Sequence, residues 1–214
     1  TVEFFSDMSK ANNAATSGQT LWNKMPKANA ELFALTYGSL VTELIRDYAS
    51  SSGDVEEVNA QLDRIGHSIG IRCVDELLSK AELSNVHIPT CSNLRDTAEI
   101  IAKVGFRMFL GMTSEVSNFS ADGRSFSLFL YENPLTIFVE LPPSNEDDYG
   151  APDLSKIKYS NIYCGIIRGA LEQVNMKVEC AFVKDILRGD DVNEIRVELK
   201  EVLMDGAGDD YKEE

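Results

Sequence analysis

The feature that most constrains the fold is a change in the spacing of apolar residues near residue 112. Up to that point apolar side chains recur every three or four residues, which is typical of amphipathic helices. Beyond it, Phe126, Leu128 and Leu130 alternate with residues that would face the other way, as in a strand with one buried face. Helices followed mainly by strands favour an α+β fold, with helices packed on one face of a small antiparallel sheet.

We expect helices over residues 29–48, 54–77 and 92–112, each starting at an Asn, Asp or Ser that can cap the first turn. The first of these helices is apolar around nearly its whole circumference. It should therefore cover the core on one side and either more core or a partner on the other.

Two glycines, Gly66 and Gly70, lie four residues apart within the expected helix 54–77. Each costs roughly 1 kcal/mol relative to alanine in a helix interior. Close approach of another backbone would explain both; the alternative is a weakened helix whose glycines have no role.

The second half of the chain predicts a short strand from Ile137 to Leu141 and a fourth helix over about residues 156–176. Residues 177–203 then alternate in polarity on both sides of a turn at Gly189, which predicts a closing antiparallel pair with one solvated side.

A chain of 214 residues can bury about 70% of its unfolded surface in one core. We expect a flexible arm over residues 1–21, because this segment is rich in small and polar residues, and a single domain over residues 22–204. Residues 205–214 would form an acidic tail.

The net charge of −15 argues against nucleic-acid binding, which depends on basic side chains. Many of the acids lie in the tail and in an acidic insertion from Glu146 to Asp153, so the folded body is nearer to neutral. No uncharged apolar run of about 18 residues and no signal peptide is evident, and we expect a cytoplasmic protein.

The four cysteines show no C-x-x-C spacing, and no nucleotide, metal or acyl-transfer motif occurs, so no metal, catalytic residue or bound cofactor is expected. Cys73, Cys164 and Cys180 lie in periodic segments and should be small core residues. Cys91 differs because it precedes a helix, where backbone N–H groups favour a thiolate. It could be an inert loop thiol, a reactive one, or a nucleophile paired with His87.

Several long blocks of the sequence resemble a known family. They are Glu31-Leu-Phe-Ala-Leu-Thr-Tyr-Gly-Ser-Leu-Val, Ile69-Gly-Ile-Arg, Asn133-Pro-Leu, Phe138-Val-Glu-Leu-Pro, the run from Tyr159 to Glu172 and the run from Asp185 to Arg196. In this order they resemble the small TRAPP (transport protein particle) subunits of the Bet-three type, over about residues 22–204.

The resemblance implies a non-catalytic core subunit of a vesicle-tethering complex in endoplasmic reticulum to Golgi transport. Such subunits form heterodimers with other small TRAPP subunits, or homodimers, through their first helices. Phe33, Tyr37, Leu40 and Leu44 would then lie at the subunit interface. The assembled complex promotes nucleotide exchange on a Rab-family GTPase and lies peripherally on Golgi and endoplasmic reticulum membranes.

The resemblance also implies two functional sites. Cys91 matches a cysteine that carries a palmitoyl chain held in an internal tunnel, although Thr90 stands where the family has Arg. Gly208, Asp209 and Asp210 resemble a C-terminal ending that contacts the GTPase. The alternatives are a self-acylating enzyme that uses Cys91 and a free fatty-acyl-binding protein.

Overall fold

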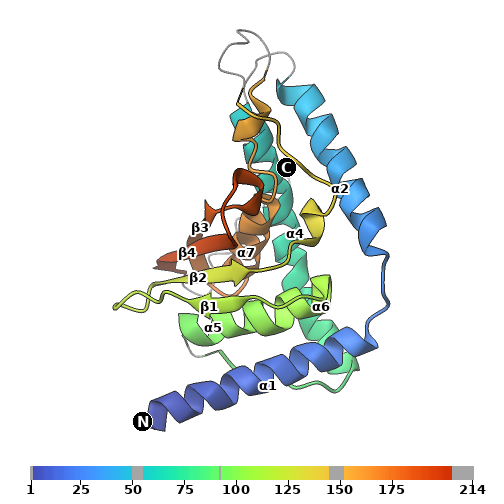
Figure 1. The fold of residues 1–214 in the computed structure, drawn as a ribbon. Helices are drawn as coiled ribbons and strands as arrows, with labels where there is room; N and C mark the ends of the chain where they lie inside the picture. The colour runs from blue at the N-terminus through green and yellow to red at the C-terminus, as the bar shows by residue number, and fades with distance from the viewer. Residues whose placement is uncertain (1, 50–54, 92, 145–151, 204–214) are drawn as a thin grey trace, which may run out of the picture.

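The computed structural model describes residues 2–49, 55–91, 93–144 and 152–203, with side chains from residue 11 onwards. Long helices are combined with one small sheet (Figure 1). In chain order the elements are α1 (Val2–Lys24), α2 (Ala30–Leu44), η1 (Ile45–Ala49), α4 (Val55–Leu83), α5 (Leu94–Ile100), η2 (Ile101–Gly105), α6 (Phe106–Leu110), β1 (Glu115–Ser117), β2 (Ser125–Leu130), η3 (Pro134–Thr136), η4 (Leu154–Lys156), α7 (Ile162–Glu172), β3 (Met176–Lys184), η5 (Ile186–Arg188) and β4 (Asn193–Val202).

The sheet has the order β1-β2-β4-β3, and every pairing is antiparallel. Its register aligns apolar residues across the strands: Val197 of β4 lies opposite Phe126 of β2 and Cys180 of β3. These side chains share one face, on which α7 packs, with α4 behind α7 (Figure 1). The α+β class is therefore confirmed.

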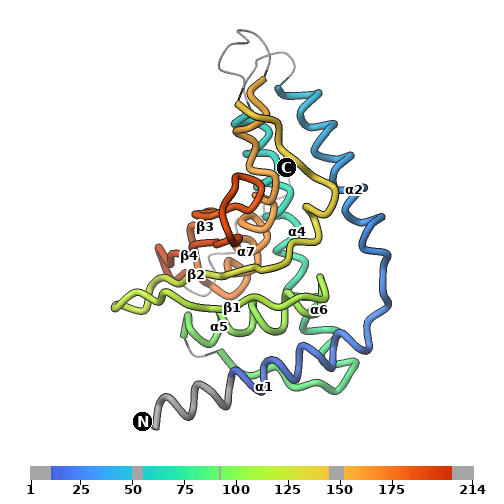
Figure 2. Tube along the Cα trace, in the orientation of Figure 1, coloured from blue at the N-terminus to red at the C-terminus, as the bar shows by residue number. Residues whose placement is uncertain are grey.

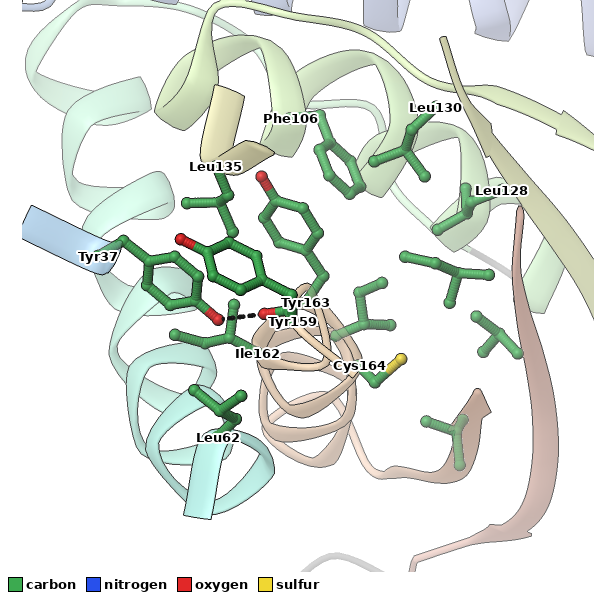
Figure 3. Packing of buried hydrophobic residues seen from close by; sticks show 14 of the residues in the cluster. Tyr37, Leu62, Phe106, Leu128, Leu130, Leu135, Tyr159, Ile162, Tyr163 and Cys164 are labelled. Carbon is green, nitrogen blue, oxygen red and sulfur yellow. Dashed lines mark hydrogen bonds between the residues drawn. The ribbon is translucent and has the colours of Figure 1, made fainter. Parts of the chain in front are cut away.

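The main core lies between this sheet face and the helices. Leu62 of α4, Ile162 and Tyr163 of α7, and Leu128 and Leu130 of β2 point into it (Figure 3). All five are buried, which explains the period-two pattern of β2 and the three-to-four spacing of the helices.

The helix starts follow their caps. The Asn29 side chain accepts a hydrogen bond from the backbone N–H of Leu32, and Asn93 does the same for Asp96. The predicted start of α4 at Asp54 lies outside the described residues; the helix is described from Val55.

Two predictions of secondary structure in the second half are wrong. Residues 137–141 form no strand: Ile137 and Phe138 follow the turn η3 and are exposed. Pro142 and Pro143 lack the backbone N–H groups that a strand donates to its neighbour. The segment borders α2 instead of the sheet. The fourth helix is shorter than 156–176, because residues 157–161 run irregularly before α7 begins at Ile162.

The prediction of a flexible arm over residues 1–21 is also corrected. This segment belongs to α1, which crosses one end of the molecule beneath α5 and α6 (Figure 2). Ala14 and Leu21, two helical turns apart, are buried in a second apolar cluster with Val104 and Met108. The many polar residues of α1 hide this narrow stripe, which explains why the pattern was missed.

Candidate functional site

Cys91 lies on the connection between α4 and α5, two residues before the cap residue Asn93, and its side chain is exposed. Its Sγ atom is 4.0 Å from the carbonyl oxygen of Pro89. The sequence therefore placed this thiol correctly, on a loop at the start of a helix.

Helix α1 holds the connection that carries Cys91. The Ser17 hydroxyl donates a hydrogen bond to the carbonyl oxygen of His87 at 2.7 Å, and the Lys24 ammonium donates one to that of Ser84 at 2.6 Å. Val86 and Ile88 pack on the second apolar cluster. No local sequence pattern predicts this role of α1, because the contacting residues are 60 or more positions apart.

The space beside this connection is small. Ala14, Pro89, Thr90 and Arg95 are among the residues around a pocket of about 50 Å³, and a water molecule takes up roughly 30 Å³. A long acyl chain on Cys91 would not fit in this pocket.

The four thiols differ in their surroundings, and no disulfide joins any two of them. Burial raises the pKa of Cys164 to about 12 and also raises the pKa of Cys180 and Cys73. Cys91 is the exposed one, so it is the thiol that an electrophile in solution can reach.

The residue immediately before Cys91 carries no charge. Thr90 is exposed and uncharged, and the Arg95 guanidinium stacks on the Phe119 ring at 3.8 Å from its centroid. His87 is exposed on the same loop.

The predicted interface residues on α2 divide into two groups. Tyr37 and Leu44 are buried in the main core, so the prediction is wrong for them; the helix needs these side chains to cover the protomer itself. Phe33 and Leu40 are exposed, at 43% and 36%.

The most exposed large apolar side chains of α2 belong to residues that the interface prediction left out. Leu32 is 66% exposed and Leu35 is 56% exposed. Their spacing of three residues places them on one face of the helix, and that spacing is visible in the sequence.

Two other predicted features lie wholly or partly outside the described residues. Gly208, Asp209 and Asp210 belong to positions 204–214, and most of the acidic insertion from Glu146 falls in 145–151. Asp153 is described: its carboxylate caps η4 by accepting from the Ser155 backbone N–H. Within the described ranges no group of three or more His, Cys, Asp or Glu could hold a metal ion, and none of the helices could span a membrane.

Comparison with known proteins gives consistent matches. The family model for transport protein particle (TRAPP) components matches residues 33–198. A trafficking protein particle complex subunit 3 from Dictyostelium discoideum is 48% identical over 188 residues, which cover 88% of this chain and 92% of that protein. The transport protein particle subunit bet3 of Schizosaccharomyces pombe is 46% identical, with coverage of 88% and 93%.

A solved structure is similar as well. The trafficking protein particle complex subunit 3 from Naegleria fowleri, crystallised covalently bound to palmitic acid, superposes with a TM-score of 0.70 at 48% sequence identity. The match covers 82% of this chain and 98% of that chain. On the match over residues 33–198 and these close relatives, the chain belongs to the family of transport protein particle (TRAPP) components.

Proposed function

We propose that this chain is a core subunit of the TRAPP vesicle-tethering complex, which it joins through the exposed apolar face of α2. The observation that carries this proposal is the row of exposed side chains at Leu32, Phe33, Leu35 and Leu40 on a helix whose opposite side lies in the core. Each apolar side chain buried at an interface contributes roughly 1.5–3 kcal/mol at full burial. Membership in a family of complex components supports the same role.

In this role the chain contributes to nucleotide exchange on a Rab-family GTPase during endoplasmic reticulum to Golgi transport, as a non-catalytic member of the assembly. Its tail, with Gly208, Asp209 and Asp210, would contact the GTPase. Acids near bound nucleotide would repel its phosphates and compete for Mg²⁺, which lowers nucleotide affinity. The protein would lie in the cytoplasm and associate peripherally with Golgi and endoplasmic reticulum membranes through the complex.

We further propose that Cys91 carries a palmitoyl chain. Its exposure supports this assignment, as does the palmitic acid bound covalently in the Naegleria fowleri relative. The pocket of about 50 Å³ beside the Cys91 connection is too small for the whole chain. Burial of the chain would contribute up to about 0.8 kcal/mol per CH₂ group.

The test is affinity purification of the tagged full chain from its own cells, with mass spectrometry of the proteins that copurify. We expect other small TRAPP subunits to copurify in near-equal amounts. Leu35→Glu should abolish this, since it buries a charge in the interface. Leu83→Glu, at an exposed position near the end of α4, is the matched control and should copurify normally. Absence of TRAPP subunits from the wild-type sample would overturn the proposal.

A further inference from the structure

Helix α1 lies outside the part of the chain that matches the family. It ends at Lys24, whereas the match to the family model begins at residue 33. The helix nevertheless packs against η2 and α6 and holds the connection that leads to Cys91 (Figure 2). The family match therefore says nothing about the role of α1, which must be inferred from its own contacts.

Cys91 lies between two fixed points of the backbone. Four residues before it, the carbonyl oxygen of His87 accepts a hydrogen bond from the Ser17 hydroxyl of α1 at 2.7 Å. Two residues after it, the Asn93 side chain caps α5 by accepting from the Asp96 N–H. The Cys91 side chain is exposed in this arrangement. Turning it toward the interior would require one of the two anchors to yield.

The anchor on α1 is the weaker of the two. The helix that Asn93 caps places Leu94 and Ala98 in the main core. No described residue of α1 belongs to that core; the helix packs on the second apolar cluster, in which its buried side chains are Ala14 and Leu21. Because apolar burial stabilises in proportion to the area covered, this narrow stripe gives limited stabilisation. Helix α1 can thus leave the body without opening the main core.

Gly18 makes the docking of α1 sensitive to a single methyl group. A Cβ at this position would overlap the carbonyl oxygen of Lys103 and lie 3.1 Å from the Cα of Val104, both in η2. These are backbone atoms, which cannot swing aside as the end of a side chain can. Alanine favours a helix over glycine, so Gly18→Ala keeps α1 helical while it pushes the helix away from η2.

We propose that α1 is a brace that holds Cys91 turned to solvent, and that release of α1 is coupled to burial of an apolar chain attached at Cys91. This inference rests on the proposed acylation of Cys91 and adds its regulation. With α1 docked, the pocket beside the connection, lined in part by Ala14, Pro89 and Thr90, is only about 50 Å³. With α1 released, the connection loses its anchor at His87 and the pocket loses its wall at Ala14. Coupling between two sites is reciprocal, so a chain on Cys91 should loosen α1, and a loosened α1 should favour the buried chain.

The test attaches the chain chemically, so that it does not depend on acylation in cells. The purified full chain is treated with hydroxylamine to remove any thioester and then with N-ethylmaleimide or N-dodecylmaleimide. The Cys91 sulfur adds to the carbon–carbon double bond of the maleimide, and the thiol proton passes to the neighbouring carbon. Peptide mass spectrometry verifies that Cys91 is the labelled thiol.

Hydrogen exchange of the two adducts gives the readout. The dodecyl adduct should speed exchange of α1 and of residues 84–88 about fivefold, at the low end of typical coupling between two sites. The ethyl adduct should exchange as the unlabelled protein does, because its substituent is too short to need burial.

Variants of α1 test the same coupling from the other side. Gly18→Ala should speed exchange of residues 84–88 about fivefold without any adduct, and its gain in Tm from the dodecyl over the ethyl adduct should exceed that of the wild type. Ser17→Ala, which removes the donor to His87, should act in the same direction, whereas Ser17→Thr keeps the hydroxyl and should exchange as wild type does. Asn13→Ala is the matched control for Gly18→Ala: it raises helix propensity on the exposed side of α1 and should change neither readout.

The outcomes separate the two proposals. If protein from its own cells carries no hydroxylamine-sensitive mass increment on Cys91, the proposed acylation fails, and the maleimide adducts still decide whether α1 is a brace. The inference is overturned if the dodecyl and ethyl adducts give the same exchange of α1. It is also overturned if Gly18→Ala and Ser17→Ala leave exchange of residues 84–88 within about twofold of wild type, below the usual coupling between linked sites.

Discussion

Gly66 of α4 and Gly165 of α7 bring the backbones of the two helices into direct contact. A Cβ added to Gly66 would lie 3.1 Å from the Cα of Gly165 and 2.2 Å from the carbonyl oxygen of Ile162. A Cβ on Gly165 would lie 2.2 Å from the carbonyl oxygen of Asp63. Because α7 in turn packs on the sheet, this contact determines how closely all three layers stack.

We expect Gly66→Ala to lower the free energy of unfolding by about 1–3 kcal/mol, since the helices must separate to admit the methyl group. This cost should exceed the roughly 1 kcal/mol that alanine gains in helix propensity. Urea denaturation measures the change. Gly105→Ala is the control: its Cβ would meet nothing closer than 3.9 Å, so it should leave stability equal or raise it. Equal effects of the two substitutions would contradict the tight contact.

Cys91→Ser should remove a hydroxylamine-sensitive mass increment from protein purified from its own cells. The reason is that a thioester forms on sulfur and Cys91 is the exposed thiol. Intact mass with and without hydroxylamine gives the readout. Cys73→Ser should retain the increment, because burial raises the pKa of that thiol. A wild-type mass without the increment would show that the site is not acylated.

Thr90→Arg should speed the reaction of Cys91 with iodoacetamide at neutral pH. A guanidinium next to the sulfur favours the thiolate, and a charge pair at about 4 Å in water is worth about 1 kcal/mol, or about fivefold in rate. Peptide mass spectrometry of each cysteine follows the reaction. In the control Thr90→Gln, which adds bulk without charge, Cys91 should react at the wild-type rate. If the rate rises as much in Thr90→Gln as in Thr90→Arg, the cause is a change in the loop and not the added charge.

Asp185→Asn should change how stability depends on pH. Burial raises the pKa of the Asp185 carboxyl above its usual range, so the folded state binds its proton more tightly than the unfolded state does. Proton binding by Asp185 therefore stabilises the folded wild type at low pH, and this stabilisation is lost as pH rises from about 4 through the raised pKa. Asparagine at position 185 can still accept the hydrogen bond from the Leu187 N–H but cannot ionise. The free energy of unfolding of the variant, relative to that of the wild type, should therefore increase with pH.

Urea unfolding at several pH values tests this prediction. Asp153→Asn is the contrasting variant: hydrogen bonding from Ser155 lowers the pKa of Asp153, so its contribution is present above the usual aspartate pKa and lost as pH falls. As pH rises, stability relative to wild type should thus increase for Asp185→Asn and decrease for Asp153→Asn. Parallel profiles for Asp185→Asn and wild type would contradict the burial effect.

Leu21→Ala should lower the free energy of unfolding by about 2–5 kcal/mol, because Leu21 is fully buried in the second apolar cluster. Hydrogen exchange of residues 84–88, which α1 contacts, should increase as well. Leu32→Ala on the exposed face of α2 should change the stability of the isolated chain by less than about 0.5 kcal/mol. A similarly small effect at Leu21 would mean that residues 1–21 do behave as a flexible arm.

Local signals in the sequence predicted most of the elements near the site. Asn29 caps the helix that it was expected to start, and Asn93 caps α5 one residue after the expected start at 92. The alternation around Leu128 is that of β2. Cys91 was likewise placed on a loop before a helix. These features depend on residues a few positions apart, within reach of one turn or one strand.

Residues 137–141 show where local signals were insufficient. Their composition favours a strand, but a strand exists only where another strand can pair with it, and β2 is already flanked by β1 and β4. The segment borders α2 instead. The burial of Tyr37 and Leu44, at positions expected to meet a partner, has the same origin.

The spacing of Gly66 and Gly70 favoured close approach of another backbone to α4 and left a weakened helix as the alternative. The structure shows that the approach occurs. The sequence could not identify the approaching helix. That it is α7, with Gly165 and Gly169 facing back toward α4, follows from burial of apolar surface across the whole chain, which brings together residues about 100 positions apart. The same long-range packing lays α1 across the Cys91 connection.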